Sequence, residues 1–494
     1  MNFSTPLVSV SLDQVLTAIL TDVPLTGLQV TGITHDNRQV KPGFVFVAIP
    51  GFSVHGAKFA AAAIEAGAVA VVTDSEGADL VGDVAVPIIK SAKPRSDMAI
   101  LAREIYGDAQ SHLMSVGITG TNGKTTTAHM VASALSDAGL SPLLLGTVGI
   151  KFGNAHIPSP RTTPESTDLH ALLLAAQQAG AQSFVMEVSS HALTLGRVDG
   201  IDFDVAVFTG LTQDHLDFHH TMDAYFEAKA QLFTEQHANH AVICLDDEWG
   251  KKLAGLCDLP TLTYSTTGKA DWTATDVKTS SDGRVTFIAQ GPATRIPVEI
   301  PLPGMFNVAN ALAAIATADL LAMSESAAAA ALRSVTVPGR LERINVSQDF
   351  VALVDYAHTP DAVSKAVAVA RTCATGRVIA VLGCGGDRDA AKREPMGAAA
   401  GRADVVIVTD DNPRSEDPAL IRASVVAGAK RTSAEVLEIA SREAAIAHAV
   451  ALATGGDCII VLGKGHESGQ EVAGVVTPFD DRTVLADSIK AARS

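Results

Sequence analysis

Residues 113–127 read Leu-Met-Ser-Val-Gly-Ile-Thr-Gly-Thr-Asn-Gly-Lys-Thr-Thr-Thr, and this stretch indicates the fold more strongly than any other part of the chain. Its first half is a short apolar run, which is typical of a buried strand. Beyond it, Ala128, Val131 and Leu135 recur at the spacing of one helix face. The stretch therefore predicts a strand, a glycine-rich turn and a helix, as in parallel α/β proteins.

The glycine-rich turn predicts a site for a nucleoside triphosphate. Backbone N–H groups of such a turn point at phosphate oxygens, and the following helix adds its positive N-terminal dipole. We expect Lys124 to reach the β- and γ-phosphates and the Thr125 hydroxyl to bind Mg²⁺. The strict pattern has a glycine where Ile118 stands, so the alternative is an ordinary turn without a ligand. The residues predicted to bind the nucleotide here are Gly120, Thr121, Asn122, Gly123, Lys124, Thr125 and Thr126.

Composition indicates a globular, cytoplasmic protein. Of the 494 residues, 47% are hydrophobic and 18% charged, and no apolar run reaches the roughly 18 residues of a membrane span. The N-terminus shows no secretory signal, and the five cysteines lack the spacing of a disulfide framework or zinc site. A net charge of −17 argues against nucleic acid or an anionic membrane as partner. We expect a monomer acting on small molecules.

Alternating strand and helix patterns predict an α/β protein with three domains. Residues 1–112 form a small α/β domain. Residues 113–336 form a central domain with a parallel P-loop-type sheet covered by helices on both faces. Residues 337–494 form a Rossmann-like domain, which begins at a hinge predicted by Pro338 and Gly339.

Polar clusters follow the predicted strands, where parallel α/β sheets bind their ligands. In the central block, strands at 116–119, 184–188 and 205–209 lead to the glycine-rich turn, to Ser189–His191 and to Gln213–His215. In the C-terminal block, strands at 378–382, 405–408 and 458–462 lead to residues 383–389, 410–414 and 463–467. We expect two sites, one in each block, that face each other across a cleft.

Three central residues stay ambiguous when considered alone. Glu187 ends a buried strand, so it is either a Mg²⁺ ligand or a helix cap or ion-pair partner of Arg197. His215 is either structural or a metal ligand. Lys229 lies in a helix that buries Phe226 and Phe233, and its pattern alone predicts a surface lysine.

The chain resembles the Mur ligase family of ATP-dependent amide ligases, which build peptidoglycan. The resemblance extends from the first domain to the last. Its markers are Gly120–Thr126, Glu187–His191, Asp214–Asp217, Ala228–Lys229, Asn307, Asn310, Pro338–Arg340 and Asp355–His358. Within the family, Asp410–Arg414 and Gly463–Glu467 resemble the members that add meso-2,6-diaminopimelate to the D-Glu γ-carboxylate of UDP-MurNAc-L-Ala-D-Glu through an acyl phosphate.

The resemblance implies a role for each matching residue. It implies ATP, two Mg²⁺ ions and a carbamate on Lys229, with Lys124, Glu187, His215 and Lys229 as the catalytic set. The implied metal ligands are Thr125, Glu187, His215 and Lys229. The implied ATP contacts outside the turn are Asn307, Asn310, Arg340, Asp355 and His358. The implied contacts of the UDP-sugar dipeptide are His35, Asn37, Thr162, Thr163, Ser189 and Arg197, with residues 1–112 as the UDP-binding domain. The implied contacts of the acceptor, meso-2,6-diaminopimelate, are Arg388, Asp411, Asn412, Pro413, Arg414, Gly463 and Glu467.

The chemistry of Arg414 supports this acceptor independently. A guanidinium binds a carboxylate in bidentate fashion and repels the ammonium that lysine carries at the same place. The alternative for Arg414 is a surface ion pair with Asp410 or Glu416. Three alternative functions are a lysine-adding ligase, a folylpolyglutamate synthetase and a P-loop ATPase that acts as a switch on a partner.

Overall fold

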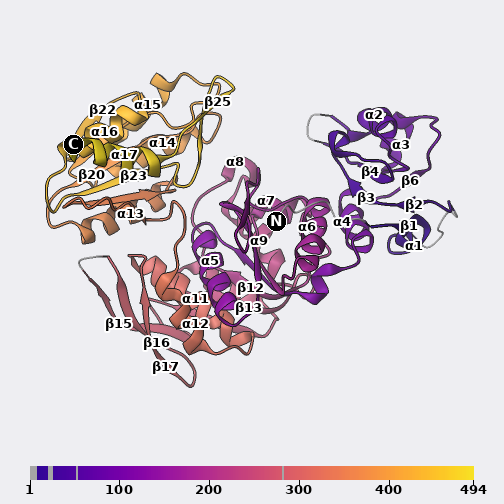
Figure 1. Cartoon of the computed structure of the whole chain (residues 1–494), viewed down its shortest axis with the longest axis horizontal. Helices are drawn as coiled ribbons and strands as arrows, with labels where there is room; N and C mark the ends of the chain where they lie inside the picture. The colour runs from indigo at the N-terminus through magenta and orange to yellow at the C-terminus, as the bar shows by residue number, and fades with distance from the viewer. Residues whose placement is uncertain (1–7, 21–25, 52–53, 281–282, 494) are drawn as a thin grey trace.

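The structure is a computed structural model that describes residues 8–20, 26–51, 54–280 and 283–493. Three bodies, each built on its own sheet, follow one another along the chain (Figure 1). The central body lies between the other two, with the N-terminal body beside α6 and the C-terminal body beyond the end of α5. Among the described residues, none of the helices is long and apolar enough to cross a membrane.

The central sheet, counted over the described residues, has 11 strands in the order β10-β9-β8-β11-β7-β12-β13-β14-β15-β16-β17. Neighbours from β8 to β15 are parallel, while β9, β10, β16 and β17 are antiparallel hairpin strands at the two edges. The predicted parallel sheet is therefore confirmed for the centre of a mixed sheet. The bounds are β7 (Met114–Thr119), β8 (Pro142–Gly146), β9 (Gly149–Phe152), β10 (Ala155–Ile157), β11 (Ser183–Glu187), β12 (Phe203–Phe208), β13 (Ala238–Cys244), β14 (Thr261–Ser265), β15 (Trp272–Thr279), β16 (Val285–Gln290) and β17 (Arg295–Ile300).

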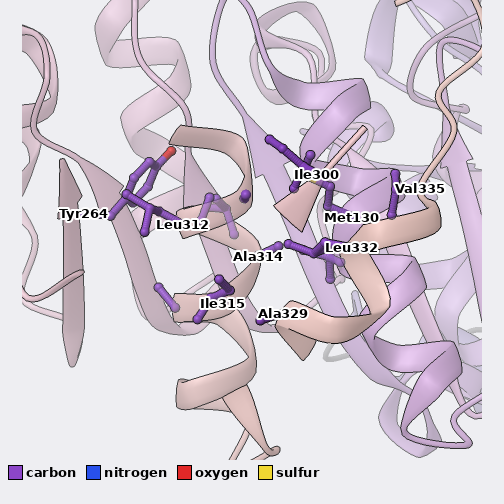
Figure 2. Close-up of a cluster of buried hydrophobic side chains, with 14 of the residues drawn as sticks. Met130, Tyr264, Ile300, Leu312, Ala314, Ile315, Ala329, Leu332 and Val335 are labelled. Atoms are coloured by element: carbon purple, nitrogen blue, oxygen red, sulfur yellow. The ribbon is translucent and has the colours of Figure 1, made fainter. Parts of the chain in front are cut away.

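Helices cover both faces of this sheet because its strands are apolar on both sides. Val116 and Ile118 of β7 enter one core with the helices α5, α11 and α12, whereas Phe184 and Met186 of β11 enter the other. Figure 2 shows the first core, where Leu312 and Ile315 face the sheet and neighbouring helices. The bounds are α5 (Lys124–Asp137), α6 (Ser166–Gln178), α7 (Ser190–Thr194), α8 (Leu216–His219), α9 (Met222–Ala230), α10 (Glu248–Leu256), α11 (Met305–Leu320) and α12 (Glu325–Ala331), with 3-10 turns η4 (Gln231–Phe233) and η5 (Leu332–Ser334).

The C-terminal body is doubly wound, as expected of a Rossmann-like domain. Its strands lie in the order β18-β19-β23-β20-β21-β22, and all neighbours except the β18–β19 pair are parallel. One core packs under α13–α15 and the other under α16 and α17. The bounds are β18 (Glu342–Arg343), β19 (Val351–Asp355), β20 (Val378–Leu382), β21 (Val405–Val408), β22 (Glu435–Glu438), β23 (Cys458–Leu462), β24 (Gly469–Val472), β25 (Val475–Pro478), α13 (Pro360–Cys373), α14 (Arg393–Ala400), α15 (Pro418–Ala429), α16 (Arg442–Leu452), α17 (Asp481–Arg493) and the 3-10 turn η6 (Ala390–Lys392).

The N-terminal body has a parallel sheet, β3-β4-β5-β6, and its helix α4 packs on α6 of the central body. The bounds are β1 (Val10–Ser11), β2 (Gln29–Val30), β3 (Gly32–Thr34), β4 (Phe44–Ala48), β5 (Ala70–Thr73), β6 (Ile88–Lys90), α1 (Leu12–Leu16), α2 (Ala60–Glu65), α3 (Ser75–Val81), α4 (Pro94–Ile105) and the 3-10 turns η1 (Asn37–Gln39), η2 (Gly56–Phe59) and η3 (Ala109–His112). The three-domain α/β architecture is confirmed, and the boundaries at 112/113 and 336/337 stay predictions.

Candidate active site

The glycine-rich turn joins β7 to α5 and lies between the ends of β11 and β12. Gly123 has φ 89°, and a Cβ there would lie 2.6 Å from Asn310 Oδ1, so only glycine fits. The Lys124 amine curls back and donates to the carbonyl oxygens of Gly120 at 2.9 Å and Thr121 at 3.0 Å. Burial lowers the pKa of Lys124, and the charge of Glu187 opposes that shift. A phosphate oxygen is a stronger acceptor than these carbonyls, so the turn can receive one.

Glu187 is 2% exposed and lies at the end of β11 beside the start of α5. Its Oε2 accepts from the Thr125 hydroxyl at 3.0 Å and from the Thr147 hydroxyl at 3.1 Å, and its Oε1 accepts from the Thr147 N–H at 2.8 Å. The alternative pair with Arg197 is wrong, because that guanidinium lies 2.8 Å from Glu165 instead. Sequence reasoning missed Thr147, which lies in the turn between β8 and β9.

Lys229 is buried on α9, so the surface position that its pattern predicts is wrong. Only 1% of it is exposed, and its Nζ donates to the Gly120 carbonyl at 3.0 Å and lies 4.8 Å from the centre of the Tyr225 ring. Burial, followed by the charge of Lys124, holds the pKa of the Lys229 amine well below its usual value. Burial thus disfavours the charged form of this amine, which lies next to the glycine-rich turn.

His215 lies at a positive φ of 54° and faces the same aromatic residue as Lys229. Its ring meets the Tyr225 ring at 6.1 Å and the His191 ring at 4.9 Å, both edge-on, and its Nε2 lies 3.5 Å from an Asp214 oxygen. Burial lowers the pKa of His215 to about 4, although Asp214 opposes this. The neutral ring keeps a lone pair that could bind a cation.

The donors in this region suit Mg²⁺. Within the described ranges, no group of three or more His, Cys, Asp or Glu residues is arranged to hold a metal ion. The Thr125 hydroxyl and the Glu187 carboxylate are oxygen donors 3.0 Å apart at the phosphate-binding turn. Mg²⁺ commonly takes one or two protein oxygens and completes its shell with phosphate and water, so these residues fit it.

A cavity of about 410 Å³ opens beside the glycine-rich turn, between the central and C-terminal bodies. It brings together nine of the residues predicted to bind ATP, namely Thr121, Asn122, Gly123, Thr126, Asn307, Asn310, Arg340, Asp355 and His358. Sequence reasoning missed Phe306, Tyr356 and Lys365 in its lining. Phe306 and Tyr356 lie beside or within the marker motifs, but an aromatic residue or a lysine there is common in any sequence and does not by itself indicate a ligand contact.

Arg340 connects the two bodies. Its Nη2 donates to the Thr125 hydroxyl at 3.1 Å, and its guanidinium lies 4.5 Å from the centre of the Tyr356 ring. Asp355 accepts from the N–H groups of Leu341 at 2.7 Å and Ala357 at 2.8 Å, and burial raises its pKa. These contacts hold the hinge against the nucleotide cavity.

The residues predicted for the dipeptide lie on the other side of Glu187. The Thr163 hydroxyl donates to the Glu187 carbonyl oxygen at 2.8 Å and accepts from the Ser189 N–H at 3.1 Å. The hydroxyls of Thr162 and Thr147 are 3.1 Å apart. Glu187 thus contacts Thr125 of the glycine-rich turn through its side chain and Thr163, which is predicted to bind the dipeptide, through its main chain.

Arg197 belongs to an ionic cluster centred on the buried carboxylate of Glu165. Arg197 Nε lies 2.8 Å, Arg95 Nη1 3.2 Å and Arg161 Nε 3.8 Å from its carboxylate oxygens. Burial alone would raise the pKa of Glu165, but these arginines and His35 hold it below its usual value. His35 thus lies near the dipeptide residues.

The predicted uridine contacts are less closely grouped. Asn37 lies in η1, which Asp36 caps, while the neighbouring Arg38 is exposed and paired with Asp36 at 2.6 Å. A cavity of about 460 Å³ lies between the N-terminal and central bodies and is lined by residues of both. Neither His35 nor Asn37 is among these lining residues.

The acceptor motifs meet at the carboxyl ends of β21 and β23. Buried Lys464 donates to Asn412 Oδ1 at 2.9 Å and lies 3.3 Å from a Glu467 oxygen and 3.6 Å from an Asp411 oxygen. Asn412 Nδ2 donates to Glu467 at 2.9 Å. A Cβ on Gly463 would lie 2.5 Å from Asp411 Oδ2, so glycine permits this packing. Sequence reasoning overlooked Lys464 within its motif.

Arg414 follows buried Pro413 and has a positive φ of 52°. Its Nη1 donates to the Gly386 carbonyl at 2.6 Å, and its Nε lies 3.5 Å from Glu471. The alternative ion pairs are wrong, because Asp410 pairs with Arg422 and Glu416 with Arg393. Arg388 is exposed. Within the described ranges, its one hydrogen bond is to the carbonyl oxygen of the neighbouring Asp387, at 3.4 Å, so the fold does not bring it into the cluster.

This combination of fold and site defines an ATP-dependent ligase, and the chain belongs to the Mur ligase family. Residues 29–106 match the "Mur ligase family, catalytic domain", residues 118–318 the "Mur ligase middle domain" and residues 339–465 the "Mur ligase, glutamate ligase domain". The resemblance predicted from the motifs is confirmed.

Its relatives carry a more specific name. The UDP-N-acetylmuramoyl-L-alanyl-D-glutamate–2,6-diaminopimelate ligase of Streptomyces coelicolor is 49% identical over 471 residues, which cover 94% of this chain and 93% of the relative. The ligase of that name from Corynebacterium efficiens is 45% identical, covering 96% and 93%. A solved structure of a ligase with this name is 33% identical, with a TM-score of 0.70 over 98% of this chain and 100% of that one.

Proposed function

We propose that this chain joins meso-2,6-diaminopimelate to the D-Glu γ-carboxylate of UDP-MurNAc-L-Ala-D-Glu, using ATP, as a step of peptidoglycan synthesis. The names of its relatives support this reaction. The observation that carries it is the position of Glu187. Its carboxylate accepts from Thr125 at the phosphate-binding turn, while its carbonyl accepts from Thr163 at the dipeptide position. A γ-phosphate and a donor carboxylate bound there would be neighbours.

The reaction needs positioning and charge neutralisation. A carboxylate oxygen of the donor attacks the γ-phosphorus, ADP leaves, and an acyl phosphate forms. The deprotonated amine of the acceptor then attacks the acyl carbon, the C–O bond to phosphate breaks, and phosphate leaves. Lys124 and the N-terminus of α5 neutralise charge that builds on the phosphate oxygens. Holding both substrates in register supplies a large part of the rate enhancement.

Two Mg²⁺ ions belong to this proposal. Thr125 and Glu187 would hold them on the nucleotide side, with His215 and a carbamate on Lys229 as the other protein ligands. The ions would screen the charge between the attacking carboxylate and the phosphates.

The buried Lys229 amine supports carbamylation. Its depressed pKa favours the neutral form. The nitrogen lone pair would attack the carbon of CO₂ and lose a proton to solvent, which gives a carbamate anion. This change converts the buried amine beside Lys124 into a group with two oxygen ligands suited to Mg²⁺.

For the acceptor, the C-terminal cluster supports diaminopimelate. Arg414 offers a guanidinium for the distal carboxylate, with Asp411, Asn412 and Glu467 as acceptors for the ammonium group. L-Lysine lacks that carboxylate and presents its side-chain ammonium without a neighbouring counter-charge, so the Arg414 guanidinium would repel it. We assign Pro413 and Gly463 to shaping this site and keep Arg388 as a contact that would need its loop to move.

Further parts of the proposal concern the whole protein. We propose the domains 1–112, 113–336 and 337–494, with the first binding the UDP moiety through His35 and Asn37. We propose a cytoplasmic monomer, whose product would serve cell shape and cell division.

Phosphate release by the purified chain tests this function. The mixture holds ATP, Mg²⁺ and UDP-MurNAc-L-Ala-D-Glu, with diaminopimelate or L-lysine. Release that depends on both the dipeptide and diaminopimelate is expected. Release with lysine would overturn the acceptor, and release that needs neither would indicate an ATPase.

A further inference from the structure

His466 bridges the two bodies that hold the two halves of the active site. It belongs to the acceptor loop 463–467, yet its Nε2 lies 3.0 Å from the carbonyl oxygen of Thr147 in the central body. Because a carbonyl only accepts, Nε2 carries the ring proton and donates. Thr147 is the residue whose N–H and hydroxyl both bind the Glu187 carboxylate.

The backbone around His466 is packed tightly against the hinge. Gly465 has φ 54°, and a Cβ on it would lie 2.7 Å from Tyr356 Cβ and 2.8 Å from the Gly339 carbonyl oxygen. A Cβ on Gly339 would in turn collide with His466 N. The centres of the His466 and Tyr356 rings are 5.1 Å apart, and the Tyr356 ring also contacts the Arg340 guanidinium. The ring therefore has little freedom to leave Thr147.

His466 also adjoins the groups that form the acceptor cluster. The next residue, Glu467, accepts from Asn412 at 2.9 Å and lies 3.3 Å from Lys464. A continuous set of contacts thus leads from the acceptor cluster through His466 and Thr147 to Glu187. Arg340 makes a second connection, which ends on Thr125.

We propose that His466 is a positioning residue that holds the acceptor loop at a fixed place relative to Glu187 by donating to the Thr147 carbonyl. This inference rests on the proposed function. Through this bond, the acceptor amine and the acyl phosphate are kept within reach of each other. The bond is made within the protein, so His466 need not touch either substrate.

Burial and the charge of Arg340 lower the pKa of His466 to about 4. The ring therefore stays neutral near pH 7 and keeps one N–H for Thr147. Its Nδ1 is buried and, within the described residues, has no hydrogen-bond partner. The Nε2–Thr147 bond is the polar contact of this ring that the structure records.

A matched pair of variants separates the hydrogen bond from the packing. Glutamine carries an amide nitrogen at about the reach of Nε2, whereas the amide of asparagine stops near the position of Nδ1. His466→Asn should raise the diaminopimelate KM about tenfold and release phosphate without forming a matching amount of amide. The ATP KM should change little. His466→Gln should behave like the wild type.

Amide hydrogen exchange tests the bridge without any substrate. His466→Asn should speed exchange in both the 463–467 loop and the 146–149 turn, while His466→Gln leaves it unchanged. Wild-type exchange and kinetics in His466→Asn would overturn the proposal, as would equal losses in both variants. If the wild type forms no amide, the proposed function fails, and the exchange result still decides whether the bridge exists.

Discussion

Thr147→Val tests the support of Glu187 directly. The substitution keeps the β-branched shape and the backbone N–H that donates to Oε1 at 2.8 Å. It removes the hydroxyl, which donates to Oε2 at 3.1 Å and also lies 3.1 Å from the Thr162 hydroxyl. A hydrogen bond to a charged group is worth about 1.5–3 kcal/mol. Each 1.4 kcal/mol corresponds to about tenfold. Loss of a hydrogen-bond partner of a metal-binding side chain generally lowers metal affinity or activity by about 10- to 100-fold.

We therefore expect the half-saturating Mg²⁺ concentration of Thr147→Val to rise about 10- to 100-fold. The assay is phosphate release at saturating ATP, dipeptide and diaminopimelate, titrated with Mg²⁺. Thr147→Ser keeps the hydroxyl and should stay close to the wild type. An unchanged Mg²⁺ dependence in Thr147→Val, or equal losses in the two variants, would show that the Thr147 hydroxyl does not support Glu187 in binding Mg²⁺.

Three further predictions concern other groups. Lys229→Ala should abolish ligation, with partial recovery on adding a short-chain carboxylate; full activity in the unsupplemented variant would exclude the carbamate. Arg414→Lys loses the bidentate grip and should raise the diaminopimelate KM at least tenfold with little change for ATP; an unchanged KM would remove Arg414 from the site. Burial lowers the pKa of His170 to about 3, so between pH 6.5 and about 3 the unfolded chain binds a proton that the folded chain does not. Acidification therefore lowers the free energy of unfolding. In urea melts at pH 7.5 and pH 5, the wild type should lose more free energy of unfolding than His170→Gln. Equal losses in the two proteins would contradict this.

The strands could be predicted because parallel sheets have continuous apolar runs that end at polar clusters. The predicted ranges 378–382, 405–408 and 458–462 are those of β20, β21 and β23. The edge hairpins were not predicted, because β9 and β10 are short and because β16 and β17 alternate buried with exposed residues, so neither pair has a continuous apolar run. The gathering of the strand-end clusters followed from topology alone.

Within the site, the residues carried by motifs could be found, and those defined by long-range contacts could not. Lys229 is buried because the face of α9 that carries it packs under the glycine-rich turn. Helix periodicity does not reveal this contact between distant segments. Thr147 reaches Glu187 across 40 positions, and Lys464 reaches Asn412 across 52. No motif surrounds Thr147, and the motif that contains Lys464 does not show which residue this lysine contacts.

Product analysis under competition between the two amino acids tests which acceptor this enzyme uses. The purified chain is given ATP, Mg²⁺, UDP-MurNAc-L-Ala-D-Glu and equal concentrations of meso-diaminopimelate and L-lysine, and the UDP-linked products are separated and weighed by mass spectrometry. We expect the diaminopimelate tripeptide to be almost the sole product, formed together with an equal amount of phosphate. A lysine tripeptide, or phosphate without any tripeptide, would exclude the proposed reaction.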